Sequence, residues 1–249
     1  MTNIIFASDL DNTLIYSQSK INSGICIEIY NEHQQGFMTE RTYENFGQMT
    51  ENVRFIPVTT RSVEQFRRIK FPNGYIPEYV LTSNGATLLH NGEPVEEWEL
   101  ICRNEKLSGL LNAVYERYCD DSRFRICRIV DGAFVYVVCN DGENSLSIAE
   151  ELRAKEDIAV EVTGRKIYFF PDGLNKGAAV KKLCEKLSAD KIIAAGDSSM
   201  DAPMLNIADI ALIPDNFDMR LMTSENYVKC PQDSTFSDFI VEKLSEEWK

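Results

Sequence analysis

Short apolar runs that end in polar residues recur along the chain and predict buried parallel strands. The first run, residues 4–7, ends in Asp9-Leu10-Asp11-Asn12-Thr13. Strands of a parallel sheet are buried on both faces and therefore read as continuous apolar runs. Helical apolar spacing separates the runs, which favours an α/β fold with a Rossmann-like, doubly wound, mainly parallel sheet. The later strands are expected at residues 53–58, 79–82, 191–195, 210–213 and 227–228.

Helix and turn signals lie between these strands. Thr39 and Ser62 are predicted N-caps, the first for a helix that extends to about residue 49. Residues 17–35 predict a short hairpin or flap that overhangs the end of the first strand. Asn91-Gly92 is a strong two-residue turn signal, so residues 86–97 predict a second hairpin. Further helices are expected over residues 175–187, near 204–205, and over 236–244.

The pattern changes between residues 98 and 171. Helical spacing over 104–118 precedes two predicted strands, 124–130 and 133–139. The same order then recurs, with a helix over 144–155 and strands over 158–162 and 166–170. This repeated helix-strand-strand pattern predicts a small α+β domain with an antiparallel sheet. We therefore expect residues 1–97 and 172–249 to form the core and residues 98–171 an inserted cap.

Composition and charge narrow the classes of partner. The 249 residues are enough for a core and a smaller domain, and 44% hydrophobic residues suit a packed interior. A net charge of −13 disfavours nucleic acid and anionic membranes as partners. The seven cysteines form no Cys-x-x-Cys pair, and no leader or membrane-length apolar segment is visible. We therefore expect a cytoplasmic protein with reduced thiols, whereas its oligomeric state stays open.

Residues with reactive side chains collect where predicted strands end or the next helices begin. Ligands bind at the carboxyl ends of strands in open α/β sheets. Asp9 and Asp11 are close enough to repel each other unless a cation or shared proton compensates, and Mg²⁺ prefers oxygen ligands. An Asx-rich turn or simple helix capping explains each motif singly, but the joint arrangement predicts a cation beside a bound phosphate. Besides Asp9 and Asp11, the residues at these strand ends and helix starts are Thr59, Thr60, Lys176, Asp197 and Asp201.

Four segments carry a resemblance to a known family. In order and spacing, DLDNTL (9–14), SNGA (83–86), NKG (175–177) and GDSSMDAPML (196–205) resemble the haloacid dehalogenase superfamily of phosphotransferases. The insertion resembles a type IIB cap, as in the Cof-like and sucrose-phosphate phosphatases. The resemblance covers essentially the whole chain. It implies a Mg²⁺-dependent phosphomonoesterase that hydrolyses a small phosphorylated metabolite, with a sugar phosphate favoured, through an aspartyl phosphate.

The resemblance also implies a role for each site residue. Asp9 is implied as the nucleophile, and Asp11 as the group that protonates the leaving oxygen and then activates water. The backbone carbonyl of Asp11 is implied to face the metal. The resemblance assigns phosphate binding to Thr59, Thr60 and Lys176. It assigns metal binding to Asp9, Asp11 and Asp197, with Asp201 as an outer ligand or support. It further implies that Thr13 supports the loop and that Arg61 and Asn84 lie near the phosphate end of the substrate.

Two positions depart from the family pattern. Thr60 stands where Cof-like members usually have Gly, and Met200 stands where they usually have Asn. Met cannot hydrogen-bond as Asn does, so the surroundings of the metal or phosphate must be arranged differently. These departures put the substrate subclass in question, while every charged or nucleophilic position of the motifs is retained.

Alternatives remain open for the cap and for the reaction. Arg117, Arg123, Arg125 and Arg128 lie close together, and Arg123 and Arg125 are expected on one strand face. They either meet an anionic or polyhydroxylated leaving group or, as we favour, form a solvated face paired with acids of the cap. The alternative reactions are a phosphomannomutase-like phosphosugar mutase and a non-catalytic phosphometabolite sensor. The presence of both Asp9 and Asp11 disfavours the sensor.

Overall fold

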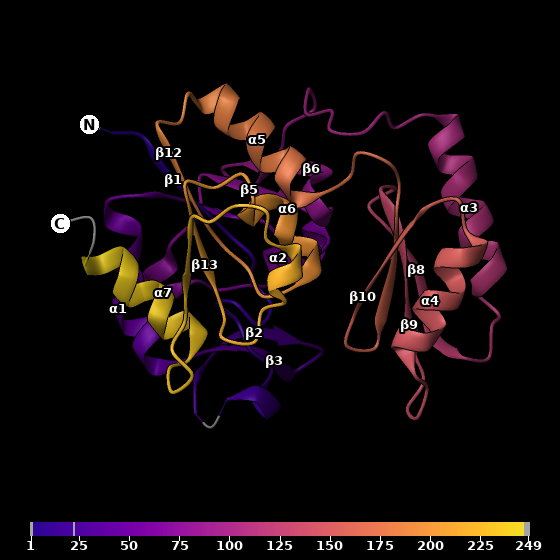
Figure 1. The fold of residues 1–249 in the computed structure, drawn as a ribbon, viewed down its shortest axis with the longest axis horizontal. Helices are drawn as coiled ribbons and strands as arrows, with labels where there is room; N and C mark the ends of the chain where they lie inside the picture. Colours follow the sequence, from indigo (N-terminus) through magenta and orange to yellow (C-terminus); the bar gives the residue numbers. More distant parts are fainter. Residues whose placement is uncertain (1, 22, 247–249) are drawn as a thin grey trace. The chain divides into compact units, whose positions relative to one another are not determined.

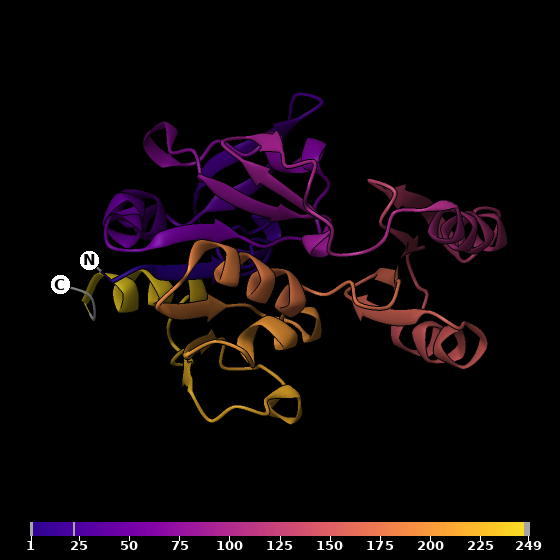
Figure 2. The same cartoon turned by 90° about the horizontal axis from the view of Figure 1, so that it is seen from above.

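A computed structural model describes residues 2–21 and 23–246 (Figures 1 and 2). The chain divides into two compact units. One comprises residues 1–95 and 176–249, and the other residues 96–175. The function of residues 98–171 as a cap stays a prediction.

A five-stranded parallel sheet forms the centre of the first unit. Its spatial order is β14-β13-β12-β1-β4, and every neighbouring pair is parallel, as the apolar runs predict. The strands that follow β1 in the chain lie on both sides of it. In such sheets a crevice opens beside the carboxyl end of the strand where the order reverses. The bounds are β1 (Ile4–Ser8), β4 (Arg54–Pro57), β12 (Lys191–Ala195), β13 (Ile210–Ile213) and β14 (Tyr227–Lys229).

Helices cover both faces of this sheet. Figure 1 shows α1 (Glu40–Glu51) and α7 (Phe236–Glu246) on one side, and α5 (Lys176–Leu187) with α6 (Ala202–Leu205) on the other. Alternate strand residues enter the core under α1 and α7, where Phe6, Phe46 and Ile240 are buried in one cluster. The helix α2 (Val63–Arg67) follows β4.

The predicted N-caps are confirmed. The Thr39 side chain accepts a hydrogen bond from Thr42 N at the start of α1. Ser62 and Gln65 form a reciprocal capping box at the start of α2, which fixes the direction in which the chain leaves β4.

Two smaller sheets complete the first unit. The predicted flap is an antiparallel hairpin of β2 (Ile25–Tyr30) and β3 (His33–Met38), preceded by the 3-10 helix η1 (Gln18–Lys20). Asn22, within the predicted flap, lies outside the described residues. The third sheet is β5 (Tyr79–Thr82), β6 (Thr87–His90) and β7 (Glu93–Pro94), and a parallel bridge from Leu81 to Val58 links it to the end of β4.

The second unit has the predicted helix-strand-strand order twice. Its strands form an antiparallel sheet in the order β10-β11-β9-β8. Tyr118 stacks on Phe169 with ring centroids 5.2 Å apart, which packs the first helix on the sheet. The elements are α3 (Glu105–Tyr118), β8 (Phe124–Val130), β9 (Phe134–Cys139), α4 (Ser145–Lys155), β10 (Ala159–Thr163) and β11 (Lys166–Phe170).

One expectation for the second unit needs correction. Arg123 precedes β8 and does not share a strand face with Arg125. Its guanidinium pairs with Asp121 at 2.7 Å and with Glu151 at 2.9 Å, as in the favoured explanation of arginines paired with acids of the same domain. Arg125 is exposed on β8.

The remaining global features can be stated briefly. No helix among the described residues combines the length and apolar character that a bilayer crossing requires. All seven cysteines are free thiols, and Cys139, Cys184 and Cys230 are buried.

Candidate active site

Asp9 and Lys176 form a buried ion pair at the carboxyl end of β1. Asp9 directly follows the strand, and its backbone N–H donates to Ala195 O at the end of the neighbouring β12 (2.9 Å). Lys176 is the first residue of α5 and is 1% exposed. Its Nζ lies 2.6 Å from Asp9 Oδ1 and 2.6 Å from Asp201 Oδ1. Lys176 therefore joins two acids from separate segments of the chain.

Asp201 is fixed by hydrogen bonds to both of its carboxylate oxygens. Oδ1 accepts from Lys176, whereas Oδ2 accepts from Asp197 N (3.1 Å), Ser198 N (2.9 Å) and Ser198 Oγ (2.7 Å). Gly196 makes this loop possible, because a Cβ there would lie 2.4 Å from Asp201 Cβ. The fully buried Asp201 thus orients the loop and the ammonium of Lys176.

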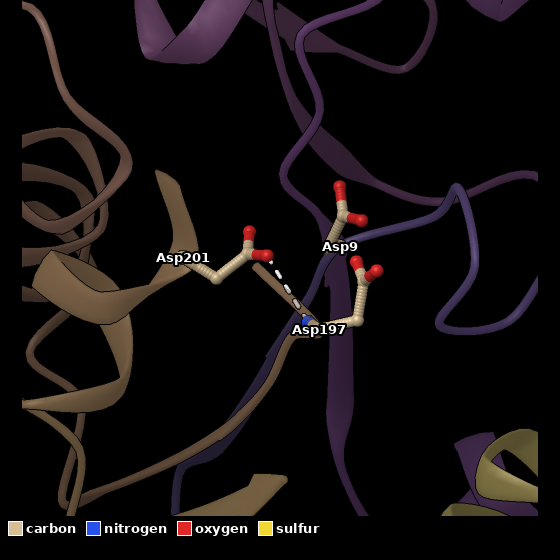
Figure 3. A group of neighbouring side chains, drawn as sticks. All are labelled: Asp9, Asp197 and Asp201. Atoms are coloured by element: carbon tan, nitrogen blue, oxygen red, sulfur yellow. Dashed lines mark hydrogen bonds between the residues drawn. The ribbon is translucent and has the colours of Figure 1, made fainter. Parts of the chain in front are cut away.

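Three carboxylates meet beside this loop (Figure 3). Asp9, Asp197 and Asp201 each offer an oxygen, and these atoms lie within 4.8 Å of one another. In Figure 3 the Asp197 carboxylate points toward Asp9, and Asp201, from the same loop as Asp197, accepts a hydrogen bond from Asp197 N. Acidic oxygens at this spacing are suited to a hard divalent cation.

Burial and mutual repulsion change the proton affinity of these acids. For Asp197, burial is the largest cause and Asp201 adds to it, while Lys176 opposes, and the pKa rises to about 7. Burial likewise raises the pKa of Asp9 well above its usual range, against the attraction of Lys176. Burial disfavours the Lys176 ammonium, but Asp201 and Asp9 outweigh that cost and raise its pKa. The three carboxylates, when ionised, therefore carry more negative charge than the single positive charge of Lys176 neutralises.

The side chain of Asp11 is not among the three grouped acids. Arg61 donates two hydrogen bonds to it, from Nε to Oδ2 (2.8 Å) and from Nη2 to Oδ1 (2.7 Å). The Asp11 side chain is 49% exposed, so it borders solvent on its other side. Burial disfavours the Arg61 charge, but Asp11 and Glu28 outweigh this and raise the pKa of Arg61. Arg61 therefore contacts Asp11 directly, a contact that the sequence does not predict.

Thr59 lies at the centre of a loop junction. The residue is fully buried, and its Oγ1 accepts from Arg61 N (3.1 Å) while its hydroxyl hydrogen can still donate. Two backbone bonds tie the Ser83–Gly85 turn to this segment, from Asn84 N to Thr59 O and from Ser83 N to Arg61 O, both 2.8 Å. The partly exposed Thr60 follows. The structure thus brings Thr59, Arg61 and Asn84 together.

Two charged residues of this region were not predicted as site residues. Glu28, in β2, is 3% exposed and contacts Arg61. A glutamate within the apolar run ICIEIY is a signal that the sequence does offer. Lys20, in η1, donates to Asn12 Oδ1 (2.7 Å), and its charge lowers the pKa of Asp197 against the larger effect of burial. The sequence gives no comparable signal for Lys20.

Comparison with known protein families gives a match over part of the chain. The model of the haloacid dehalogenase-like hydrolases matches residues 120–229, a stretch that contains Lys176, Asp197 and Asp201. The match supports the resemblance at the NKG and GDSSMDAPML segments, which lie within it, whereas the DLDNTL and SNGA segments lie outside the matched residues.

Two phosphoglycolate phosphatases match parts of this chain. The protein of Picrophilus torridus is 27% identical over 100 residues, 39% of this chain and 42% of the relative. The protein of Pyrobaculum neutrophilum is 40% identical over 86 residues, 33% of this chain and 35% of the relative. The chain thus spans less than half the length of the curated relatives it matches.

Solved structures share the fold over nearly the whole chain. The sucrose-phosphatase of Synechocystis sp. PCC6803, solved with sucrose and phosphate, has a TM-score of 0.68 at 18% identity and covers 98% of both chains. A trehalose-6-phosphate phosphatase related protein has a TM-score of 0.58 at 18% identity, covering 98% of this chain and 97% of its own. At this identity the likeness concerns the fold alone.

Proposed function

We propose that the chain is a Mg²⁺-dependent phosphomonoesterase that hydrolyses a small phosphorylated metabolite, with a sugar phosphate as the favoured class. The observation that carries this proposal is the buried Asp9–Lys176 pair beside Asp197, at the carboxyl end of β1. Phosphatases among the partial relatives and sugar-phosphate phosphatases among the structural neighbours support it. We further propose that residues 98–171 act as a cap that selects the substrate, and that the protein works in the cytoplasm, where its cysteines stay reduced.

The donor set fits a hard divalent cation. Asp9 and Asp197 would hold it, with the backbone carbonyl of Asp11, because the oxygens of Asp201 are already occupied by hydrogen bonds to Lys176, Asp197 N and Ser198. The pKa values of Asp9 and Asp197 are raised first by burial and then by the neighbouring carboxylates, and a cation would compensate these negative charges. When bound, the cation would offset charge on the carboxylates and on the transferred phosphoryl group.

The chain's own residues supply the chemistry. An oxygen of Asp9 attacks phosphorus, the ester P–O bond breaks, and Asp11 gives its proton to the leaving oxygen. A water molecule then attacks the aspartyl phosphate while Asp11 takes its proton, which frees phosphate and Asp9. Lys176 stays charged beside Asp9, and Thr59 with Thr60 holds the phosphoryl oxygens. Such positioning and charge compensation supply most of the acceleration in phosphoryl transfer.

A phosphate-release screen tests this function. The panel contains sugar phosphates, phosphoglycolate, nucleotides and cofactor phosphates, each assayed with Mg²⁺ and again with EDTA. We expect turnover that needs Mg²⁺ and that Asp9→Asn abolishes. Asp233→Asn, a matched change at an exposed position, should leave turnover intact.

Three outcomes of the same screen would contradict the proposal. Hydrolysis that survives Asp9→Asn would exclude Asp9 as nucleophile. Conversion of a sugar phosphate to its isomer, stimulated by a bisphosphorylated sugar, would favour the mutase. Absence of turnover across the panel would favour the non-catalytic sensor.

A further inference from the structure

Four charged residues of alternating sign connect the loop after β1, the two ends of α2 and the flap hairpin of β2 and β3. Arg61 holds both carboxylate oxygens of Asp11, and its Nη1 donates to Glu28 Oε2 at 2.7 Å. The other Glu28 oxygen, Oε1, lies 3.2 Å from Arg68 Nε. The Arg68 guanidinium in turn lies over the ring of Tyr30, 4.3 Å from its centroid. Asp11, Arg61, Glu28 and Arg68 therefore form a continuous row of opposite charges.

The backbone around Glu28 is irregular in a way that directs its side chain toward Arg61. Glu28 pairs with Gly36 across the hairpin, and the register shifts on both sides of this pair. Bulges of this kind turn a side chain away from its regular direction and are frequent beside active sites. Gly36 also gives the carboxylate room, since a Cβ there would lie 3.1 Å from Glu28 Oε2.

A backbone contact fixes the hairpin against the segment that follows α2. Lys70 N donates to Ile27 O at 2.7 Å, and Glu28 forms a bridge with Ile69. Glu28 is thereby held on both sides, by β3 and by the chain after α2. These backbone contacts, together with the rotamer of the Glu28 side chain, keep its carboxylate in contact with Arg61.

Stability alone is a weak explanation for this buried carboxylate. Removing two opposite charges from water costs free energy that their attraction often fails to regain, and an apolar pair of similar size is commonly as stable. Glu28 instead fixes the orientation of the Arg61 guanidinium. Arg61 has a planar fork of donors, and with Nη1 on Glu28 its remaining donors face the two oxygens of Asp11.

We propose that Glu28 is a positioning residue for the acid–base step: it fixes Arg61, and Arg61 sets the direction of the Asp11 carboxylate. This inference rests on the proposed function and deepens it. A displaced Asp11 delivers its proton poorly to the leaving oxygen. The loss is greatest when the leaving group needs that proton most, because an activated aryl leaving group departs with little protonation.

A leaving-group series tests the role of Glu28. The probes are substituted phenyl phosphates from p-nitrophenyl phosphate to unsubstituted phenyl phosphate, and the readout is the slope of log kcat/KM against leaving-group pKa. Glu28→Gln keeps the size of the side chain, but one amide oxygen cannot accept from Arg61 and Arg68 together. We expect kcat/KM for phenyl phosphate to fall on the order of 10- to 100-fold, p-nitrophenyl phosphate to be affected much less, and the slope to steepen.

The controls separate positioning from stability. Arg68→Lys changes the far partner of Glu28 without touching Asp11, and Glu32→Gln changes an exposed acid of the same hairpin, so both should keep the wild-type slope. Glu28→Asp keeps the charge but shortens the side chain, so it should steepen the slope and serves as a second variant if Glu28→Gln does not fold. An unchanged slope in the folded Glu28 variants overturns the inference, as does failure of both to fold, since Glu28 would then be structural. Hydrolysis by the wild type decides the proposed function separately.

Discussion

At the residue scale, Asp197 shows how incompletely the protein alone balances the negative charge of the site. Its carboxylate is mostly buried beside Asp201 and Asp9, and Lys176 only partly compensates. Its pKa of about 7 lies above the ordinary value of 3.8. The folded chain therefore holds this proton more tightly than the unfolded chain does.

This difference predicts the pH dependence of the metal-free protein. Below about pH 4 both states carry the proton, and the contribution of Asp197 to folding stability is fully present. It is lost as the pH rises through about 7, because the folded state must then keep a buried, poorly compensated charge. Asp9, whose pKa is also raised, acts in the same direction. We expect the Tm of EDTA-treated protein to fall between about pH 5 and pH 8 more steeply than that of Asp197→Asn.

The same titration gives a control with metal. Mg²⁺ binds the ionised carboxylates and therefore should raise the Tm more at pH 8 than at pH 5, by mass action on the folded state. Asp197→Asn should show a smaller rise at the higher pH. If the metal-free wild type gained stability with pH relative to Asp197→Asn, the electrostatic account of this site would be wrong.

At the element scale, the site depends on how closely α5 approaches α6. Gly177, the second residue of α5, faces the backbone of Pro203, and a Cβ there would lie 2.3 Å from Pro203 O. Backbone cannot move aside as the end of a side chain can. Close packing at Gly177 therefore fixes Lys176 relative to the segment that carries Asp201.

Gly177→Ala should separate these two elements. We expect a loss of about 1–3 kcal/mol in unfolding free energy, typical of overpacking, and a lower kcat because Lys176 moves relative to Asp201. Urea unfolding and phosphate release measure the two effects. Gly47→Ala is the matched control, because nothing lies within 4 Å of a Cβ at this position inside α1. It should stabilise the protein by about 0.5–1 kcal/mol and leave kcat unchanged, so equal effects of the two changes would contradict the argument.

Local patterns predicted the elements, because short-range physics determines them. Apolar runs identify β1 and β12, and the side-chain caps Thr39 and Ser62 identify two helix starts. The motifs also identify the acids that the structure groups, Asp9, Asp197 and Asp201.

Contacts between distant side chains were not predictable in this way. The hydrogen bonds from Arg61 to Asp11 depend on side-chain rotamers, and Arg61 also contacts Glu28 of the flap hairpin. No local spacing in the sequence encodes these contacts. Arg123 was assigned to a strand face although the predicted strand, 124–130, begins one residue later, as β8 does. Its pairing with Asp121, two residues away, is a local turn contact that competes with strand pairing.

At the scale of the whole molecule, the charge of −13 opposes the binding of an anionic substrate. For the proposed phosphate ester, attraction would therefore come from groups within the site, namely Lys176, Arg61 and the proposed cation, and not from the overall field. Salt screens long-range repulsion more than it screens contacts inside a buried site.

This balance predicts an unusual response to ionic strength. For an anionic phosphate ester at saturating Mg²⁺, kcat/KM should stay constant or rise modestly between about 20 and 150 mM NaCl. The reason is that screening removes a repulsion and leaves the local contacts. Repeating the series with KCl controls for effects of the particular ion. A steep fall with both salts would indicate electrostatic steering toward the site and contradict this prediction.

The central claim is that Asp9 becomes covalently phosphorylated beside a bound divalent cation. Turnover of an active substrate with Mg²⁺, quenched in acid, followed by peptide mass analysis, tests it most directly. We predict a phosphoryl group on the peptide that contains Asp9, absent with EDTA and absent in Asp9→Asn. Phosphate release with the phosphoryl group on another residue would contradict the account. So would a phosphoryl group on this peptide that persists in Asp9→Asn.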